Sequence, residues 1–381
     1  MPSPALPGGG RKESADSGDP KVAKLGVPDP MLDSREYDDL DALTERYEKL
    51  TQPGALAKLG KRALEIVPDG FKDSVADIGK GLTKQEIYDQ AIKLIGEGFK
   101  ALEGHAVRMT VSEADVIKGL DGVLGPGAVT SLEEVCLARG YDVSKAANGS
   151  NLQHILAAFA EGGSTGALGF AGIPFNLVLS TFFYYRAVQC VALAYGYDVK
   201  GDPGELVIAG EVFASAMNPG SQGGEVTSDI AKIMALGAAE GVKAAAKKGW
   251  AEMIAHGGPA LLIAQMRALA NAAANKALQK AGQKGLEGSV FREVFQQIGK
   301  RLSLKAVQRA VPVVSAGIGA FIDTAQMNRV LQYADIFYHK RFLLEKEDRV
   351  ARLFGREAGY GEEPFPDEVD YVVVDDEGDG E

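Results

Sequence analysis

The hydrophobic pattern of the chain centres on an uncharged stretch from Gly162 to Tyr185. Proline occupies position 174, and a long apolar run follows it as far as Ala194. Proline is tolerated in the first turn of a helix because its missing amide would be unsatisfied there anyway, and Gly196 is typical of a helix end. The pattern predicts an apolar helix from about residue 174 to residue 194. It also predicts a segment before this helix that permits close helix packing, with Gly162, Gly166, Gly169, Gly172 and Pro174.

A weaker version of the same design lies between residues 308 and 346. Pro312 and several small residues, Gly317 and Gly319 among them, precede a long helical pattern with an apolar face. Small residues let two helices approach each other closely. We therefore expect two buried, apolar, glycine-led helical hairpins. Their helices, at 174–194 and 320–346, should lie side by side in the interior.

Local start and stop signals predict further helices along the chain. Ser112 is placed to cap one helix, Ser131 with Glu134 suggests a capped turn, and Asp202-Pro203 begins another helix. Other helical patterns occupy residues 35–50, a stretch from Asp142 or Ser144 toward Phe159, and the alanine-rich region 226–285. The β-prone run at Tyr371–Val374 stands alone, so the predicted fold class is all-α, a multi-helix globular domain.

Several of these segments resemble the bacterial EcsC family. The chain reads G-x-x-G-x-x-G-x-P up to Pro174, then a helix with an internal Arg186, then A-x-x-Y-G-Y-D up to Asp198. A later P-x-x-S-A-G-I-G-A segment leads to a helix with R-F-L at Arg341, and IVPDGFKDSV at 66–75 fits more loosely. The resemblance covers roughly residues 55–350. It implies a helical, membrane-associated accessory protein of no settled biochemical activity, from a family named after a protein encoded beside an ABC-type exporter.

The two ends of the chain differ in composition from this helical region. Residues 1–34 are rich in Pro, Gly, Ser and charge, and residues 355–381 contain eleven acidic residues. Such segments lack the apolar residues needed to build a core. We therefore expect a disordered lead at 1–34, a helical EcsC-like domain at 35–354, and a disordered acidic tail at 355–381.

The net charge of −11 hides a strong polarity along the chain. Residues 243–310 hold twelve Lys or Arg against three Glu. Lys276, Lys280 and Lys284 are spaced four residues apart, which places them on one helix face. The opposite face carries apolar and small residues: Leu262, Met266, Leu269, Ala273 and Ala277. The lysine face is either a solvated helix surface or a surface for anionic lipid or another polyanion. Its candidate lipid-facing residues are Lys276, Lys280, Lys284, Lys300, Arg301, Lys305 and Arg309.

The sequence offers no recognisable catalytic, cofactor-binding or metal-binding constellation. It lacks a Walker A motif and a G-x-S-x-G elbow, and its four histidines have no His or Cys within four residues. We expect each histidine to be a surface or capping side chain. The two cysteines, Cys136 and Cys190, imply no disulfide framework, which fits a reducing cytoplasm. The basic region has no aromatic interleaving, so nucleic acid is not an expected partner.

Arg186 follows the uncharged stretch inside the predicted apolar helix. A buried guanidinium needs a carboxylate or several carbonyls, because an unpaired buried charge is very costly. Asp323, early in the second helical hairpin, is the candidate partner for a buried ion pair. The alternative is an Arg186 side chain that extends to the surface and stays exposed.

Three hypotheses for function follow from these features. The first is a non-enzymatic accessory or adaptor protein, cytoplasmic and peripheral at the inner membrane face, that binds anionic lipid or a membrane partner such as an exporter. The second is a soluble scaffold or cargo-type protein that binds a larger protein assembly. The third is a hydrolase or transferase with an unrecognised site. The apolar stretch from Gly162 either inserts into a bilayer or forms a buried hairpin.

Overall fold

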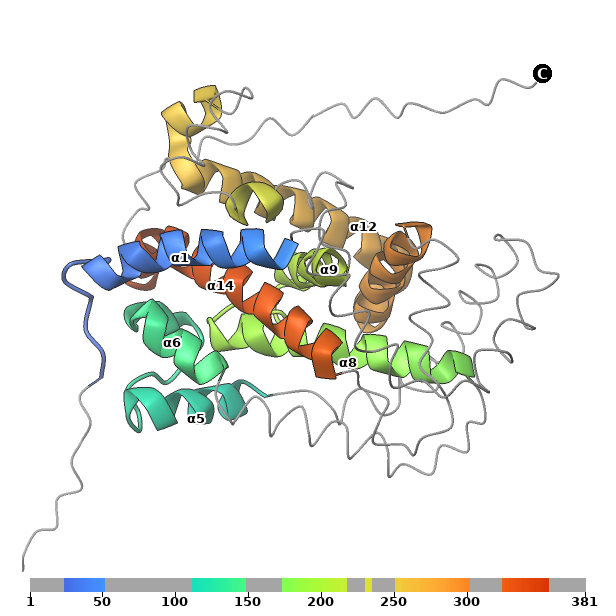
Figure 1. Ribbon diagram of the computed structural model, residues 1–381, viewed down its shortest axis with the longest axis horizontal. Coiled ribbons are helices and arrows are strands. Elements are labelled where there is room, and N and C mark those ends of the chain that lie inside the picture. The colour runs from blue at the N-terminus through green and yellow to red at the C-terminus, as the bar shows by residue number, and fades with distance from the viewer. Residues whose placement is uncertain are drawn as a thin grey trace, which may run out of the picture.

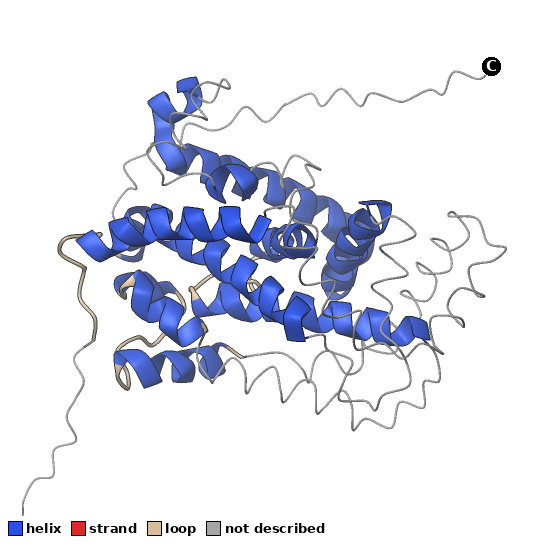
Figure 2. Ribbon diagram, viewed as in Figure 1, coloured by secondary structure: helices blue, strands red, loops and turns tan. Residues whose placement is uncertain are grey.

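The computed structural model describes residues 24–51, 112–148, 173–217, 230–234, 251–301 and 324–355; within these helices, the side chains of 173–181, 251–261, 283–284, 295–301 and 324–325 are not described. Every regular element in these ranges is helical, which confirms the all-α fold class (Figure 1, Figure 2). The elements are α1 (Ser34–Thr51), α5 (Glu113–Leu124), η2 (Glu133–Leu137), α6 (Gly140–Ala147), α8 (Ile173–Ala194), α9 (Pro203–Met217), α12 (Ala251–Arg301) and α14 (Thr324–Leu353).

Local capping signals set the starts of α5 and α9 as predicted. The Ser112 side chain accepts a hydrogen bond from the Asp115 amide, and the Asp115 carboxylate accepts one from the Ser112 amide, which together form a capping box. At α9, the Asp202 carboxylate accepts a hydrogen bond from the Gly204 amide at 2.8 Å. Each cap satisfies amides that the first turn of a helix would otherwise leave without partners.

The helix predicted to start at Asp142 or Ser144 begins instead at Gly140 and ends at Ala147. Its start is set by a residue from outside the segment: the Glu36 carboxylate of α1 accepts a hydrogen bond from the Gly140 amide at 2.8 Å. At the other end, the Asn148 side-chain amide donates to the Ser144 carbonyl at 3.0 Å and to Asp335 at 2.8 Å. Residues distant in sequence therefore help to set both ends of α6. Residues 149–172, which include the rest of the predicted helix, lie outside the described part of the chain.

The alanine-rich region contains α12, which continues past the predicted end at residue 285 to Arg301. Gly282 has a φ of +68°, a value that L residues rarely adopt, and α12 changes direction along its length (Figure 1). The buried stripe of its first part is Leu262, Ile263, Met266, Ala270 and Ala274. Ala273, which the sequence placed on the apolar side, is exposed. The later part continues because Val290, Phe291 and Val294 are buried against neighbouring helices.

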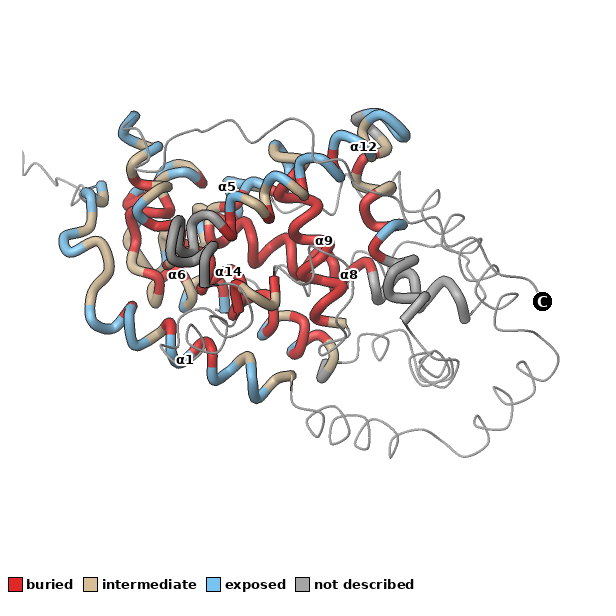
Figure 3. Tube along the Cα trace, turned by 90° about the horizontal axis from the view of Figure 1, so that it is seen from above, coloured by how far each residue is buried: buried red, intermediate tan, exposed pale blue. Residues whose placement is uncertain are grey.

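The core lies between α8, α9 and α14, as the buried segments in Figure 3 show. Aromatic rings from three helices meet there: Tyr185 of α8 lies 5.7 Å from Phe213 of α9 and 5.6 Å from Phe291 of α12, measured between ring centroids. α8 and α14 pack directly against each other. The prediction that the helices at 174–194 and 320–346 are interior and adjacent is therefore confirmed for their described residues.

Gly210 of α9 allows a close helix approach that the sequence did not predict. A Cβ atom added at Gly210 of α9 would lie 2.8 Å from Cγ2 of Val294 and 3.2 Å from Cγ1 of Val290, both on α12. The predicted packing glycines, Gly162, Gly166, Gly169, Gly172, Gly317 and Gly319, lie outside the described residues. Pro174 lies in the first turn of α8, as expected, and its side chain is not described.

The described part of the N-terminal lead packs against the domain. The Leu25 amide donates to the Ala128 carbonyl at 3.2 Å, and Arg139 donates to the Pro30 carbonyl at 3.1 Å. Packing therefore begins before the predicted boundary at residue 34, although α1 begins at that residue. Residues 1–23 and 356–381 lie outside the described part of the chain.

Candidate functional site

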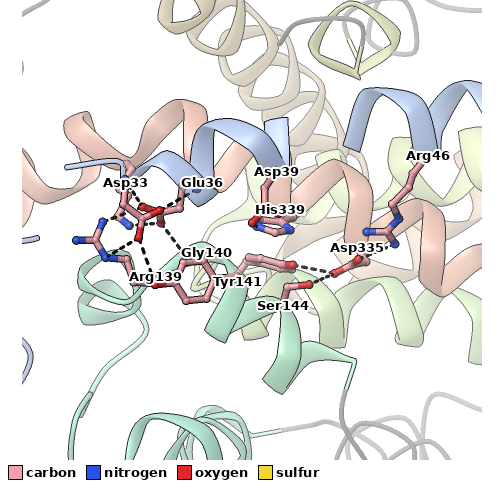
Figure 4. Close-up of polar contacts among 12 residues, drawn as sticks. Asp33, Glu36, Asp39, Arg46, Arg139, Gly140, Tyr141, Ser144, Asp335 and His339 are labelled. Carbon is pink, nitrogen blue, oxygen red and sulfur yellow. Dashed lines mark hydrogen bonds and ion pairs between the residues drawn. The ribbon is translucent and has the colours of Figure 1, made fainter. Parts of the chain in front are cut away.

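α14 carries a run of ionisable side chains that are almost completely buried. All of them are at most 4% exposed: Asp335, His339, Lys340, Arg341, Glu345 and Lys346. A buried charge is costly unless it is paired and hydrogen-bonded, so the partners of these residues determine what α14 does. Those partners come from α1, α6, α9, the residues that follow α8, and Met234. Figure 4 shows part of the network.

Glu36 of α1 forms the first group of contacts. Its carboxylate accepts hydrogen bonds from the Asp33 amide at 3.1 Å, the Gly140 amide at 2.8 Å, Arg139 at 2.8 Å and Lys346 at 2.6 Å (Figure 4). Burial raises the pKa of Glu36, but these hydrogen bonds outweigh burial and hold the pKa below its usual value. The Glu36 carboxylate thus joins α1, α6 and α14 as an anion.

Asp335 forms the second group, which lies beside Arg46 near the other end of α1 in Figure 4. Its carboxylate accepts hydrogen bonds from the Tyr195 hydroxyl at 2.7 Å and the Ser144 hydroxyl at 3.3 Å, and it pairs with Arg46 of α1 at 3.1 Å. Burial raises the pKa of Tyr195, and the nearby Asp335 carboxylate raises it further. Glu36 and Asp335 are each occupied by several donors, an arrangement that joins helices rather than one that activates a water molecule.

Arg341 forms the third group and is completely buried. Its two terminal nitrogens donate to the two oxygens of Glu205 on α9, each at 2.7 Å, in a bidentate pair. Glu345 pairs with the Arg341 Nε at 3.2 Å and accepts the Tyr197 hydroxyl at 2.9 Å. Burial raises the pKa of Glu345, but Arg341 and two further arginines outweigh burial and lower it.

Lys340 differs from the other buried cations because both of its hydrogen-bond acceptors are uncharged. Its ammonium donates to the Thr44 hydroxyl of α1 at 2.5 Å and to the Met234 carbonyl at 2.6 Å. Burial lowers the pKa of Lys340 to about 7, although Asp41 and Glu48 of α1 oppose this shift from a greater distance. Lys340 is therefore a buried group that changes charge near neutral pH.

His339 contradicts the expectation that each histidine is a surface or capping side chain. It is 4% exposed, and its ring stacks on Tyr195 with centroids 5.6 Å apart. Its Nε2 lies 4.0 Å from the Asp39 carboxylate, and burial lowers the pKa of His339 (Figure 4). His105 and His154 lie outside the described residues, and the His256 side chain is not described.

Arg186 is buried, with 6% exposure. Its guanidinium pairs with Glu287 of α12 at 2.6 Å and donates to the Gln189 side-chain oxygen at 2.8 Å. The proposed partner Asp323 lies outside the described residues, so the Arg186–Asp323 pair stays a prediction. Cys136 and Cys190 are both buried and free, and burial raises the pKa of the Cys190 thiol to about 12.

The candidate lipid-facing residues fall into three groups. Lys276 and Lys280 are exposed on α12. Lys284, Lys300 and Arg301 belong to α12, but their side chains are not described. Lys305 and Arg309 lie outside the described residues. The structure therefore places two of the seven side chains, and both face solvent.

Sequence reasoning identified part of the buried network. The Y-G-Y segment and the R-F-L segment meet in space, because the Arg341 guanidinium lies 4.1 Å from the centre of the Tyr197 ring. Gly196, between the two tyrosines, has a φ of +78°, and a Cβ atom there would collide with the Leu132 carbonyl. The roles of Glu36, Asp335 and Lys346 were missed. Asp33-x-x-Glu36 reads as a capping box, which is the one local signal for any of them.

Comparison with protein families supports the resemblance seen in the motifs. The model of the EcsC protein family matches residues 127–343, more than half of the chain. The chain belongs to the EcsC protein family. Comparisons with curated proteins and with solved structures found no significant match. The matched region of this EcsC protein includes the Y-G-Y segment at Tyr195–Tyr197 and the R-F-L segment at Arg341–Leu343.

Two further findings concern the described residues of this EcsC protein. None of the helices in the described ranges combines the length and hydropathy needed to cross a bilayer. In the same ranges, no group of three or more His, Cys, Asp or Glu side chains is arranged to hold a metal ion.

Proposed function

We propose that this EcsC protein is a non-enzymatic accessory or adaptor protein that associates peripherally with the inner face of a membrane by binding anionic lipid. The observation that carries the proposal is the exposed surface of α12. Lys276 and Lys280 are exposed there, one helical turn apart. No Asp or Glu occurs in the sequence between Glu252 and Glu287, so this surface has no acid of its own to neutralise the lysines.

The composition of this surface indicates how it would bind. The exposed residues around the two lysines are small or polar: Ala264, Ala268, Asn271, Ala272, Ala273, Asn275, Gln279 and Ala281. Helices that insert into the lipid interface present bulky apolar side chains such as Trp, Phe or Leu. This face of α12 would therefore bind by charge rather than by insertion. Each lysine near an anionic membrane surface contributes about 1 kcal/mol, and salt screens that attraction.

A charge-reversal experiment tests the proposal. The full chain carrying Lys276→Glu and Lys280→Glu is sedimented with anionic vesicles and compared with the wild-type protein. Loss of the two attractive charges alone predicts roughly 30-fold weaker binding, and reversal adds repulsion. The matched control carries Lys118→Glu on α5 and Lys145→Glu on α6, which are also exposed and change the net charge equally.

The control separates a specific surface from the effect of total charge. The proposal expects the α5 and α6 variant to retain binding close to that of the wild-type protein. Equal weakening by both pairs of substitutions would show that net charge alone drives association. Binding that neither pair affects would remove α12 as the lipid-facing surface.

A further inference from the structure

α1 lies outside the residues that the EcsC family model matches, yet it covers a surface built largely from matched residues. It lies on α14 and contacts α6, and both helices contribute polar groups to the contact (Figure 1). Sixty residues, 52–111, separate α1 from the next described residue.

The surface beneath α1 contains a cradle for an anion. Three donors from outside α1 converge on the Glu36 carboxylate: the Gly140 amide, the Arg139 guanidinium and the Lys346 ammonium, at 2.8, 2.8 and 2.6 Å. Gly140 is the first residue of α6, and helix N-termini favour anions. Lys346 is completely buried beneath α1. Glu36 therefore occupies the cradle as an intramolecular ligand.

The other contacts of α1 follow one face of the helix. Leu40 and Leu43 are buried in the hydrophobic core. The Thr44 hydroxyl accepts a hydrogen bond from the Lys340 ammonium. The Tyr47 ring contacts the Tyr333 ring edge-on, with 6.0 Å between the ring centroids. Together with Glu36, these positions have spacings of four, seven, eight and eleven residues, which place them on one helix face. Of the eighteen residues of α1, four are buried, and only two of these are apolar.

The charges of α1 and of the surface beneath it are also complementary. α1 contains six acidic and three basic residues, and the surface that it covers presents the cations Arg139 and Lys346 to Glu36 and the anion Asp335 to Arg46. Amphipathic helices bind to protein grooves through apolar side chains at helical spacing, and charged side chains fix the orientation of the helix in the groove. With few apolar anchors, the attachment of α1 depends strongly on the contact of Glu36 with the cradle.

We propose that the surface of α14 and α6 beneath α1 is a helix-docking site, that α1 is its resident occupant, and that an acidic amphipathic helix of a partner protein replaces α1 there. The partner helix would carry a Glu for the cradle, with apolar side chains four, seven and eleven residues after it. This site is distinct from the exposed lysine surface of α12 and does not depend on lipid binding.

A peptide exchange experiment with the full chain tests the proposal. The probe is a fluorescent peptide of residues 33–51, and its anisotropy reports binding. Glu36→Gln in the protein weakens the resident helix, so the peptide should bind this variant at least about 10-fold more tightly than the wild-type protein. The same substitution in the peptide should weaken its binding by a similar factor. Glu45→Gln is the matched control in both partners, because Glu45 is exposed and its ion pair among the described residues is with Lys49 of the same helix.

Hydrogen exchange of the wild-type protein provides a measurement that needs no variant. A replaceable α1 should open locally, so its amides should exchange on the order of 100-fold faster than those of α8 and α14. Equal protection of the three helices would overturn the proposal, as would a peptide that binds the Glu36→Gln variant no better than the wild-type protein. A third result would also overturn the proposal. If anionic vesicles made the α1 amides exchange faster and the peptide did not bind, the surface beneath α1 would be a lipid-binding surface.

Discussion

Lys340 shows how one residue makes the stability of this protein depend on pH. Its folded pKa of about 7 lies below the usual 10.5, so between these values the unfolded chain binds a proton that the folded chain releases. The free energy of unfolding therefore increases as the pH rises above 7. Below pH 7 this contribution is absent, because Lys340 is protonated in both the folded and the unfolded chain. The cause is burial against two uncharged acceptors, Thr44 and Met234.

Lys340→Met should remove this contribution. Between pH 7.5 and 9.5, the free energy of unfolding of the wild-type protein should rise by about 2 kcal/mol relative to the variant, since one proton corresponds to about 1.4 kcal/mol per pH unit. Urea titrations across this range measure the difference, and Lys49→Met on the exposed face of α1 is the control. Parallel pH profiles of the wild-type protein and Lys340→Met would show that the buried amine keeps its proton.

At the scale of elements, local signals predicted those helices whose ends are capped by their own neighbours. Ser112, Asp202 and Gly196 mark boundaries of α5, α9 and α8 that the sequence placed correctly. The start of α6 was wrong because its cap, Glu36, is 104 residues away in sequence. The buried network was beyond prediction for the same reason. Tyr197 and Arg341 stood out in the motifs, and Glu345 follows Arg341 by four residues, but nothing local pairs Tyr197 with Glu345 or Arg341 with Glu205.

The contact between α8 and α12 gives a prediction at this scale. Arg186 is buried, whereas the side chain of its partner Glu287 is 37% exposed. Glu287→Gln should therefore destabilise the protein by about 2–4 kcal/mol, because it leaves a buried cation without its carboxylate. Arg186→Met should cost at least about 1 kcal/mol less, since water can hydrate the remaining Glu287. Urea unfolding midpoints measure both variants, with the exposed Glu293→Gln as the control. The opposite order would contradict this description of the pair.

At the scale of the whole molecule, charge is separated along the chain. The acidic residues of 355–381 and the basic region 243–310 balance much of each other, so the net charge of −11 does not describe either region. The interior uses charge to join α1, α6, α9 and α14, whereas the exposed surface of α12 presents lysines without acids nearby in sequence. The proposed membrane association depends on this surface of α12.

Sedimentation of the native full-length protein with neutral and with anionic vesicles, each at low and at high salt, tests the proposed function most directly. Charge-driven association predicts that the protein sediments with anionic vesicles at low salt, is released as salt rises, and stays in solution with neutral vesicles. Equal sedimentation with neutral and anionic vesicles, or no sedimentation with anionic vesicles at low salt, would contradict a peripheral protein that binds anionic lipid.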